Sequence, residues 1–210
     1  MNQPTLHKCL LNYQSFWFDR LHNPFNEDPL IVTRFIELIS TNKNPFLRES
    51  FPSHVTASCF VVNPTASQVL LLKHRKLNKW LQLGGHCDGN PETAQVAMRE
   101  AQEESGSHHL TLINWQPDLP SIFVSDLDIH TIPNSPNKPS HFHFDVRYFA
   151  ICALPHQLKR EKREATDLRW FDWTAAEHIT QEQSLHRPFK KFVMLATLFP
   201  QALSTIGKTA

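Results

Sequence analysis

The chain has 210 residues, 40% of them hydrophobic, which is enough for one sizeable core and an appendage. Its 21 lysines and arginines nearly balance its 20 aspartates and glutamates, and this balance excludes a broad positive field that would favour nucleic acid or an anionic membrane. Four scattered cysteines, the lack of a signal peptide and the lack of an apolar run of roughly 20 residues predict a cytoplasmic protein without a membrane span.

Two segments near the N-terminus, residues 6–21 and 30–39, carry the apolar spacing of amphipathic helices. The stretch 22–26, which reads His-Asn-Pro-Phe-Asn, separates them with residues that break helices. We therefore expect an N-terminal helical extension over residues 1–50 and a main domain over residues 51–210. Two roles are open for the extension: it forms the interface of a homodimer, or it caps a substrate cleft.

The main domain opens with two segments rich in β-branched and apolar residues, 54–62 and 68–74, which predict a strand hairpin. A Gly-Gly pair follows, in a chain with only five glycines, and then a helical pattern. Asn90 is a suitable N-cap and Pro91 suits the first helical position. We expect this helix to end at Gly106, because glycine is common where a helix stops.

The second half of the chain mixes strand and helix patterns. Residues 121–125, 142–150 and 168–171 are predicted strands, with a Pro-rich loop over residues 133–139. Residues 188–198 form a last predicted helix that covers the sheet. The expected class is therefore α/β (α+β), with a mixed sheet and an N-terminal helical extension.

Three glutamates of the central helix, Glu100, Glu103 and Glu104, stand at i, i+3 and i+4 and so share one face. Like charges at this spacing repel one another, and a hard divalent cation bound through oxygen would offset the repulsion. The alternative is a solvated acidic surface in which Arg99 pairs with Glu103 one turn away. The glutamate spacing alone favours this alternative, and the context of the Gly-Gly turn reverses the preference.

The chain here resembles the Nudix hydrolase family, whose box is written Gx5Ex7REUxEExGU, with U a bulky apolar residue. Gly84 also fits the family's habit of a glycine before the box. Pro91 replaces the glutamate expected in the loop, and Glu92 follows one position late. The U positions hold the small residues Ala101 and Ser107. Six residues stand at the required spacings: Gly85, Arg99, Glu100, Glu103, Glu104 and Gly106.

The resemblance implies a Nudix fold with a mixed sheet between helices, and hydrolysis of a nucleoside diphosphate linked to another group, X. Water attacks one phosphorus, a glutamate such as Glu103 takes the proton, and Arg99 braces the acidic cluster. Asp88 matches an acidic residue often found in the loop. The residues matched to ligands of magnesium or manganese are Glu100, Glu104, Glu103 and the carbonyl of Gly84.

A second polar pattern lies in the strand predicted over residues 142–150. Strict alternation places four polar side chains on one face, where they line a substrate cleft or bind a transition metal: His141, His143, Asp145 and Arg147. A half-exposed strand with incidental histidines is the alternative. Arg75 lies in a basic loop suited to phosphate, or simply in a solvated one. The stretches HVTAS, GGHxDG and HxHxDVR also resemble a bacterial subgroup of the family.

These patterns favour a magnesium- or manganese-dependent pyrophosphohydrolase acting on a small nucleotide-like diphosphate. A module that binds a nucleotide without cleaving it is the first alternative, because Pro91 replaces the loop glutamate. A prenyl-diphosphate isomerase with Cys87 near the metal is the second, and the intact string REAQEESG opposes it. Glu161 and Glu164 belong to the run KREKRE, for which a charged surface is favoured over an additional site residue.

Overall fold

The structure is a computed structural model that describes residues 5–135, 138–180 and 182–204. Its helices are α1 (Leu6–Gln14), continued by a π-helical segment (Ser15–Arg20), α2 (Ile31–Thr41), α3 (Thr93–Ser105), α4 (Trp173–Ile179), α5 (Gln183–Leu198) and α6 (Gln201–Ser204). Its strands are β1 (Ser53–Val62), β2 (Gln68–His74), β3 (Trp80–Leu81), β4 (Leu83–His86), β5 (Leu110–Leu112), β6 (Asp126–Ile132), β7 (His141–Cys152) and β8 (Ala165–Asp172).

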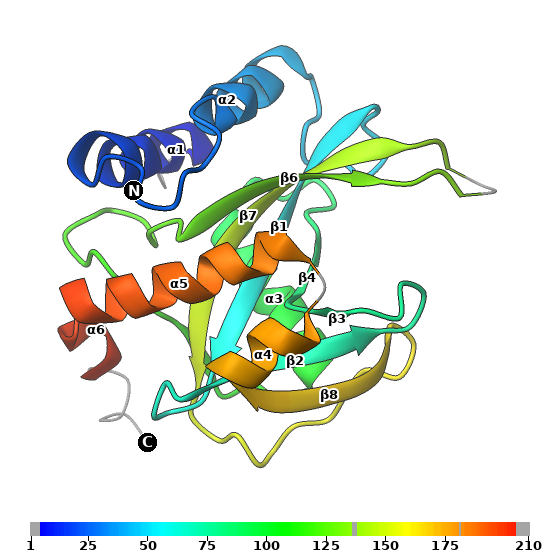
Figure 1. The fold of residues 1–210 in the computed structure, drawn as a ribbon. Helices are drawn as coiled ribbons and strands as arrows, with labels where there is room; N and C mark the ends of the chain where they lie inside the picture. The colour runs from blue at the N-terminus through cyan, green and yellow to red at the C-terminus, as the bar shows by residue number, and fades with distance from the viewer. Residues whose placement is uncertain (1–4, 136–137, 181, 205–210) are drawn as a thin grey trace.

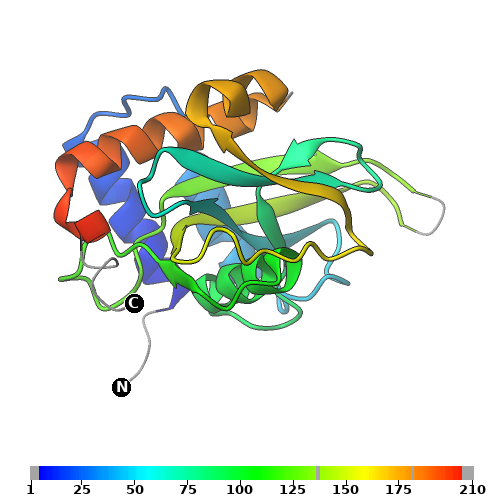
Figure 2. The same ribbon diagram turned by 90° about the horizontal axis from the view of Figure 1, so that it is seen from below.

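The strands form one mixed sheet, in which β1 and β7 are parallel and the other pairings are antiparallel (Figure 1). Strand β1 lies at its centre, because it pairs with β2, β4 and β7. Helix α3 covers one face, while α4 and α5 cover the other (Figure 2). The expected α/β (α+β) class, with a mixed sheet between helices, is confirmed.

The N-terminal extension packs directly on the sheet and shares its hydrophobic core. Trp17 and Phe35 are fully buried in the same cluster as residues of β1 and β7. The ring of Phe35 in α2 lies 5.0 Å from that of Phe144 in β7, edge to face. Burial of such aromatic side chains is a large stabilising contribution. One core therefore joins the two segments that the sequence separates at residue 50.

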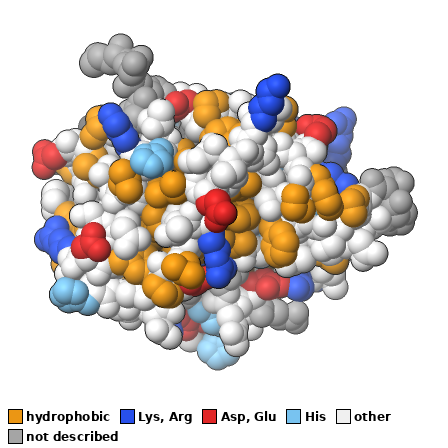
Figure 3. All heavy atoms as spheres, turned by 90° about the horizontal axis from the view of Figure 1, so that it is seen from above, with side chains coloured by type: hydrophobic (Ala, Val, Ile, Leu, Met, Phe, Trp, Pro, Cys, Tyr) orange, Lys and Arg blue, Asp and Glu red, His pale blue; other side chains and the backbone are white. Residues whose placement is uncertain are grey.

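The outer face of α1 and α2 mixes apolar and charged side chains (Figure 3). Leu11 of α1 is 48% exposed, and Leu30, just before α2, is 54% exposed. The expected homodimer stays a prediction.

Among the described residues, the structure contains no helix of sufficient length and apolarity to cross a membrane.

Helix α3 begins at Thr93, so the expected start at Pro91 with Asn90 as N-cap is wrong. Asn90 belongs to a tight turn instead: its N–H donates to the carbonyl of Cys87 at 2.9 Å, and its side chain accepts the N–H of Glu92 at 2.9 Å. The end of the helix is confirmed. Gly106 adopts a left-handed conformation with φ of 63°, which glycine tolerates without steric cost.

The strand expected at residues 121–125 is wrong, because that segment is irregular and β6 follows it at Asp126. Its apolar side chains still fill the core, which explains the strand-like pattern. The helix expected over residues 188–198 is α5, which starts earlier, at Gln183, and contains Pro188. Strand β5 and helix α4 were not expected. In the Pro-rich loop, residues 136–137 lie outside the described part of the chain.

A buried group of charges joins the extension to β6 and α5. Asp126 is fully buried and accepts hydrogen bonds from Lys191 at 2.8 Å and from Arg187 at 2.8 Å. Lys191 also lies 2.7 Å from Oε1 of Glu27, and the other carboxylate oxygen of Glu27, Oε2, accepts a hydrogen bond from Tyr13 at 2.5 Å. Buried charges are stable only when they are paired and hydrogen-bonded. These contacts therefore fix the relative positions of the N-terminal extension, β6 and α5.

Arg147 of β7 continues this buried network. Its guanidinium donates to Asp128 and Asp145 at 2.9 Å each and to Asp126 at 3.2 Å. It also donates to the carbonyl of Ser184 at 2.9 Å. That carbonyl has no helical partner, because Pro188 lacks the N–H that would bond to it. Arg147 therefore allows a proline inside α5.

Lys191→Met is expected to lower the free energy of unfolding by about 3–5 kcal/mol, because it leaves Asp126 and Glu27 buried with one cation fewer. Lys190→Met is the matched control, since Lys190 is the exposed neighbour in the same helix. Urea denaturation of the two variants measures the difference. Equal stabilities would contradict the structural role assigned to the network.

Candidate active site

The two glycines of β4 bring the backbone of the sheet against the carboxylates of α3. The N–H of Gly84 donates to Oε2 of Glu104 at 2.8 Å. A Cβ placed on Gly85 would lie 2.5 Å from the carboxyl carbon of Glu100, closer than real side chains approach. Only a residue without a side chain leaves room for that carboxylate. The Gly-Gly pair and the acidic helix are therefore one structural unit.

The carboxylates of this unit are buried to different degrees. Glu104 is 5% exposed, and burial raises its pKa to about 8 against the opposing effect of the Gly84 N–H bond. Burial also raises the pKa of Glu100. Glu103 is more open, with 59% of its side chain exposed. A buried carboxyl group, a partly buried one and an exposed one together form an oxygen-rich site that suits a hard divalent cation.

Arg99 connects the acidic residues to β4. Its guanidinium lies 2.8 Å from Oε1 of Glu100 and 3.3 Å from Oε2 of Glu103. It also donates to the carbonyl of His86 at 3.1 Å. The i, i+4 pair with Glu103 that the surface alternative required is present, but the same arginine also contacts Glu100 and the strand.

Glu164 is a fourth acidic residue at the site, although sequence reasoning favoured a charged surface for it. Its charge raises the pKa of both Glu100 and Glu104. The loop that carries it is attached to the helix, since the N–H of Glu161 donates to the carbonyl of Glu104 at 3.1 Å. No motif within KREKRE distinguishes this glutamate, because its position depends on how the loop folds back over α3.

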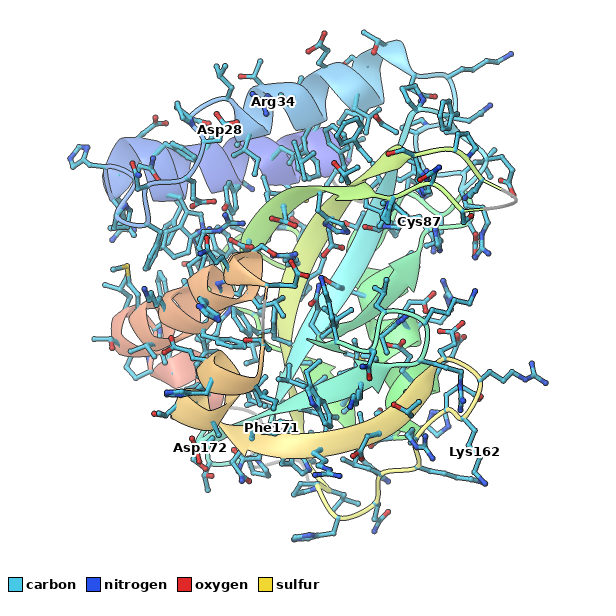
Figure 4. The ribbon with its side chains drawn as sticks, turned by 45° about the vertical axis from the view of Figure 1, so that its right-hand side comes forward. Asp28, Arg34, Cys87, Lys162, Phe171 and Asp172 are labelled. Carbon is cyan, nitrogen blue, oxygen red and sulfur yellow. The ribbon has the colours of Figure 1, made fainter. Side chains whose placement is uncertain are left out.

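Two loops lie beside the acidic cluster, one after β4 and one before β8. In Figure 4 the label Cys87 marks the loop after β4 and the label Lys162 marks the loop before β8, both on the right-hand side. Arg75 donates to the carbonyl of Lys162 at 2.7 Å. Asp88 accepts two hydrogen bonds from Arg48, at 2.6 and 2.9 Å. In this structure, Arg75 and Asp88 thus contact loop partners.

The alternating face of β7 is mostly buried: His141, Asp145 and Arg147 are buried and His143 is partly exposed. Asp145 is 3% exposed and accepts hydrogen bonds from Thr56 at 3.0 Å and Ser58 at 2.7 Å. Arg147 is 2% exposed and is held by the network described above. His141 and His143 lie at the other end of the same face. A substrate contact for these four residues stays a prediction.

Two other features contribute less to the chemistry. A cavity of about 540 Å³ between α1, the start of α3 and residues 119–122 includes Arg99 in its lining, but none of the three glutamates of α3. Cys87 is 2% exposed, and burial raises the pKa of its thiol to about 12. A thiol held protonated in this way is a poor nucleophile or acid–base catalyst, which opposes the isomerase alternative.

Comparison with known proteins identifies the family. The NUDIX domain matches residues 52–193, well over half of the chain, and the protein therefore belongs to the Nudix family. It is an enzyme of the class that hydrolyses phosphorus-containing anhydrides. A search of curated protein sequences found no match.

Solved structures agree with the fold. A NUDIX-family hydrolase from Clostridium perfringens is 27% identical, with a TM-score of 0.51, over 73% of this chain and 97% of that one. A C. elegans Ap4A hydrolase is 18% identical, with a TM-score of 0.55, over 69% and 98%. The E. coli dihydroneopterin triphosphate pyrophosphohydrolase is 20% identical, with a TM-score of 0.52, over 67% and 94%.

Gly85→Ala is expected to displace the Glu100 carboxylate and weaken divalent-metal binding with little loss of stability, because a flexible side chain is what the new methyl group meets. Gly84→Ala is the comparison, since its methyl group would meet the backbone of Ser58 and Ala57 and destabilise the sheet. Isothermal titration with manganese and thermal unfolding separate the two effects. Unchanged manganese affinity in Gly85→Ala would contradict the assigned contact.

The raised pKa of Glu104 predicts how stability depends on pH. Between the ordinary pKa of 4.5 and about 8, the folded carboxyl holds a proton that the unfolded chain releases. The metal-free protein should therefore lose stability as pH rises through this window, by at most about 1.4 kcal/mol per pH unit. Urea titrations across the window, in chelator, should give a flatter profile for Glu104→Gln than for the wild type. Glu37→Gln, at an exposed site on α2, should keep the wild-type slope.

Proposed function

We propose that the protein is a magnesium- or manganese-dependent pyrophosphohydrolase that cleaves a diphosphate bond in a nucleoside diphosphate linked to X, or in a similar small molecule. The observation that carries the proposal is the burial of Glu100 and Glu104 against the Gly84–Gly85 backbone, with the pKa of both carboxyl groups raised. A divalent cation would stabilise the ionised form of both groups.

In this proposal Glu100, Glu104, Glu103 and the carbonyl of Gly84 hold the cation. When bound, the cation neutralises phosphate oxygens and lowers the pKa of a coordinated water. Glu103 accepts the proton from the attacking water, as its exposure beside the buried pair allows. Arg99 orients both Glu100 and Glu103 through its two ion pairs.

Substrate contacts are proposed on the loops around the acidic cluster. Arg75 lies in the loop after β2 and contacts the segment that carries Glu164, so its cation is near the cluster and suits a phosphate. The names of two structural neighbours, an Ap4A hydrolase and a dihydroneopterin triphosphate pyrophosphohydrolase, describe small phosphoanhydrides. A small nucleotide-like diphosphate is therefore the first class to assay.

The test is turnover of a panel of nucleoside triphosphates, dinucleoside polyphosphates and nucleoside diphosphate sugars with magnesium or manganese. Glu103→Gln is expected to reduce kcat by about 100-fold or more on the best substrate, because it removes the proton acceptor. Glu100→Gln and Glu104→Gln should also raise the manganese concentration needed for half-maximal rate. Glu37→Gln should behave as wild type in both measurements.

Saturable nucleotide binding without turnover would overturn the proposal in favour of the non-catalytic module suggested by Pro91. Such binding should also be unaffected by Glu103→Gln. Turnover that Cys87→Ser abolishes and Glu103→Gln spares would favour the isomerase chemistry instead.

A further inference from the structure

Five histidines gather at one end of the sheet, on the face opposite α3. His54, His86 and His143 each offer a ring nitrogen, and these three atoms lie within 4.8 Å of one another. Their ring centroids are 4.8 to 5.3 Å apart. His141 stacks on His54 at 5.2 Å, and His130 approaches His143 at 5.4 Å. We call His54, His86 and His143 the histidine triad.

The strand register brings the triad together from distant parts of the sequence. His54 of β1 lies opposite His143 of β7, and His143 lies opposite His130 of β6. His86 ends β4, where its partner on β1 is Thr56, two residues from His54 and on the same face. Three neighbouring strands, β1, β4 and β7, thus present the imidazoles of the triad close together, and β6 adds His130 beside His143.

Hydrogen bonds orient several of these rings. Nδ1 of His54 lies 3.1 Å from the carbonyl of Ser50, and Nδ1 of His141 lies 2.9 Å from the carbonyl of Pro139. A carbonyl only accepts, so each Nδ1 carries a proton, and in a neutral ring the lone pair then lies on Nε2. An imidazole whose second nitrogen donates to a carbonyl is the usual arrangement of a metal-binding histidine.

The nitrogens at the centre of the cluster lack partners. His54 is 1% exposed, and its Nε2 makes no hydrogen bond within the described structure. The Nε2 atom of His143 is also buried and without a hydrogen bond there. Buried polar atoms are rarely left in this state, because desolvation without a replacement bond costs free energy. Both atoms are therefore available to a ligand that accepts a lone pair.

We propose that the histidine triad binds a transition-metal ion of the zinc class, with a fourth position open to water or an anion. Imidazole nitrogen suits zinc, cobalt and nickel, whereas magnesium prefers oxygen. Zinc–nitrogen bonds of about 2.0–2.1 Å in tetrahedral geometry place the nitrogens roughly 3.3 Å apart. The nitrogens lie within 4.8 Å of one another, so binding would draw them together by up to about 1.5 Å.

The triad is distinct from the acidic site but touches the same strand. Alternation along β4 points Gly85 toward Glu100 of α3 and His86 toward the opposite face. The carbonyl of His86 accepts the hydrogen bond from Arg99. A metal ion on the His86 side chain would therefore anchor the end of the strand that carries the Gly-Gly pair.

The test uses full-length protein without a histidine tag, freed of metal by chelation. Titration with cobalt(II) is expected to develop the strong visible absorption of a four- or five-coordinate nitrogen site with one equivalent per chain, and zinc should displace this cobalt, whereas cobalt at the oxygen-rich acidic site would add only weak six-coordinate absorption. His54→Gln, His86→Gln and His143→Gln should each weaken cobalt binding by at least about tenfold. His156→Gln, at an exposed loop position, is the control and should bind as wild type.

The double variant Glu100→Gln/Glu104→Gln separates this proposal from the proposed hydrolase function, because it should lose turnover and keep the cobalt spectrum. Zinc should also raise the melting temperature of the wild type and not that of folded His143→Gln, whose fold circular dichroism checks. Weak six-coordinate absorption alone, strong absorption retained in all three triad variants, or strong absorption lost only in the glutamate double variant would overturn the proposal.

Discussion

The buried carboxylate of Asp126 constrains the rest of the fold. Burial raises its pKa, yet the cations of Arg187 and Lys191 outweigh that effect and hold the pKa well below its ordinary value. Each of those cations comes from α5, a third comes from Arg147 of β7, and Glu27 of the extension joins through Lys191. The buried charge of Asp126 therefore depends on contacts among β6, α5, β7 and the N-terminal extension. The packing of these four segments places one face of β7 in the interior.

Along that face, β7 passes through three chemical environments. Arg147 in its middle meets the charged network, Asp145 two residues earlier is bonded to Arg147 and to two hydroxyls of β1, and its beginning carries histidines. The charged side chains of the network form ion pairs with one another, whereas Nε2 of His54 and of His143 at the histidine end makes no hydrogen bond within the described structure. On the other face of the sheet, the absence of a side chain at Gly85 leaves room for the Glu100 carboxylate of α3. The histidine cluster and the acidic site therefore share strand β4, which carries His86 on one face and Gly85 on the other.

The sequence predicted the local parts of this arrangement well. The spacing of Glu100, Glu103 and Glu104, the helix end at Gly106 and the alternation of β7 all follow from the periods of helices and strands. It missed features that depend on distant contacts. Glu164 approaches the acidic site because its loop folds over α3, and Pro188 sits inside a helix because Arg147 supplies the donor that proline lacks. Asn90 was assigned as a helix cap because its use within a tight turn leaves no separate signature.

The parallel pairing of β1 with β7 has a consequence for how the chain reaches this structure. Thr56 and Asp145, which face each other in the sheet, are 89 residues apart in sequence. Parallel pairing across such a distance closes slowly, because loop-closure entropy is lost before the contacts form. During synthesis, the edge of β1 that pairs with β7 stays unpaired until β7 has left the ribosome. The molecule therefore completes its sheet late, and translation of its second half is the interval in which association with other chains competes with folding.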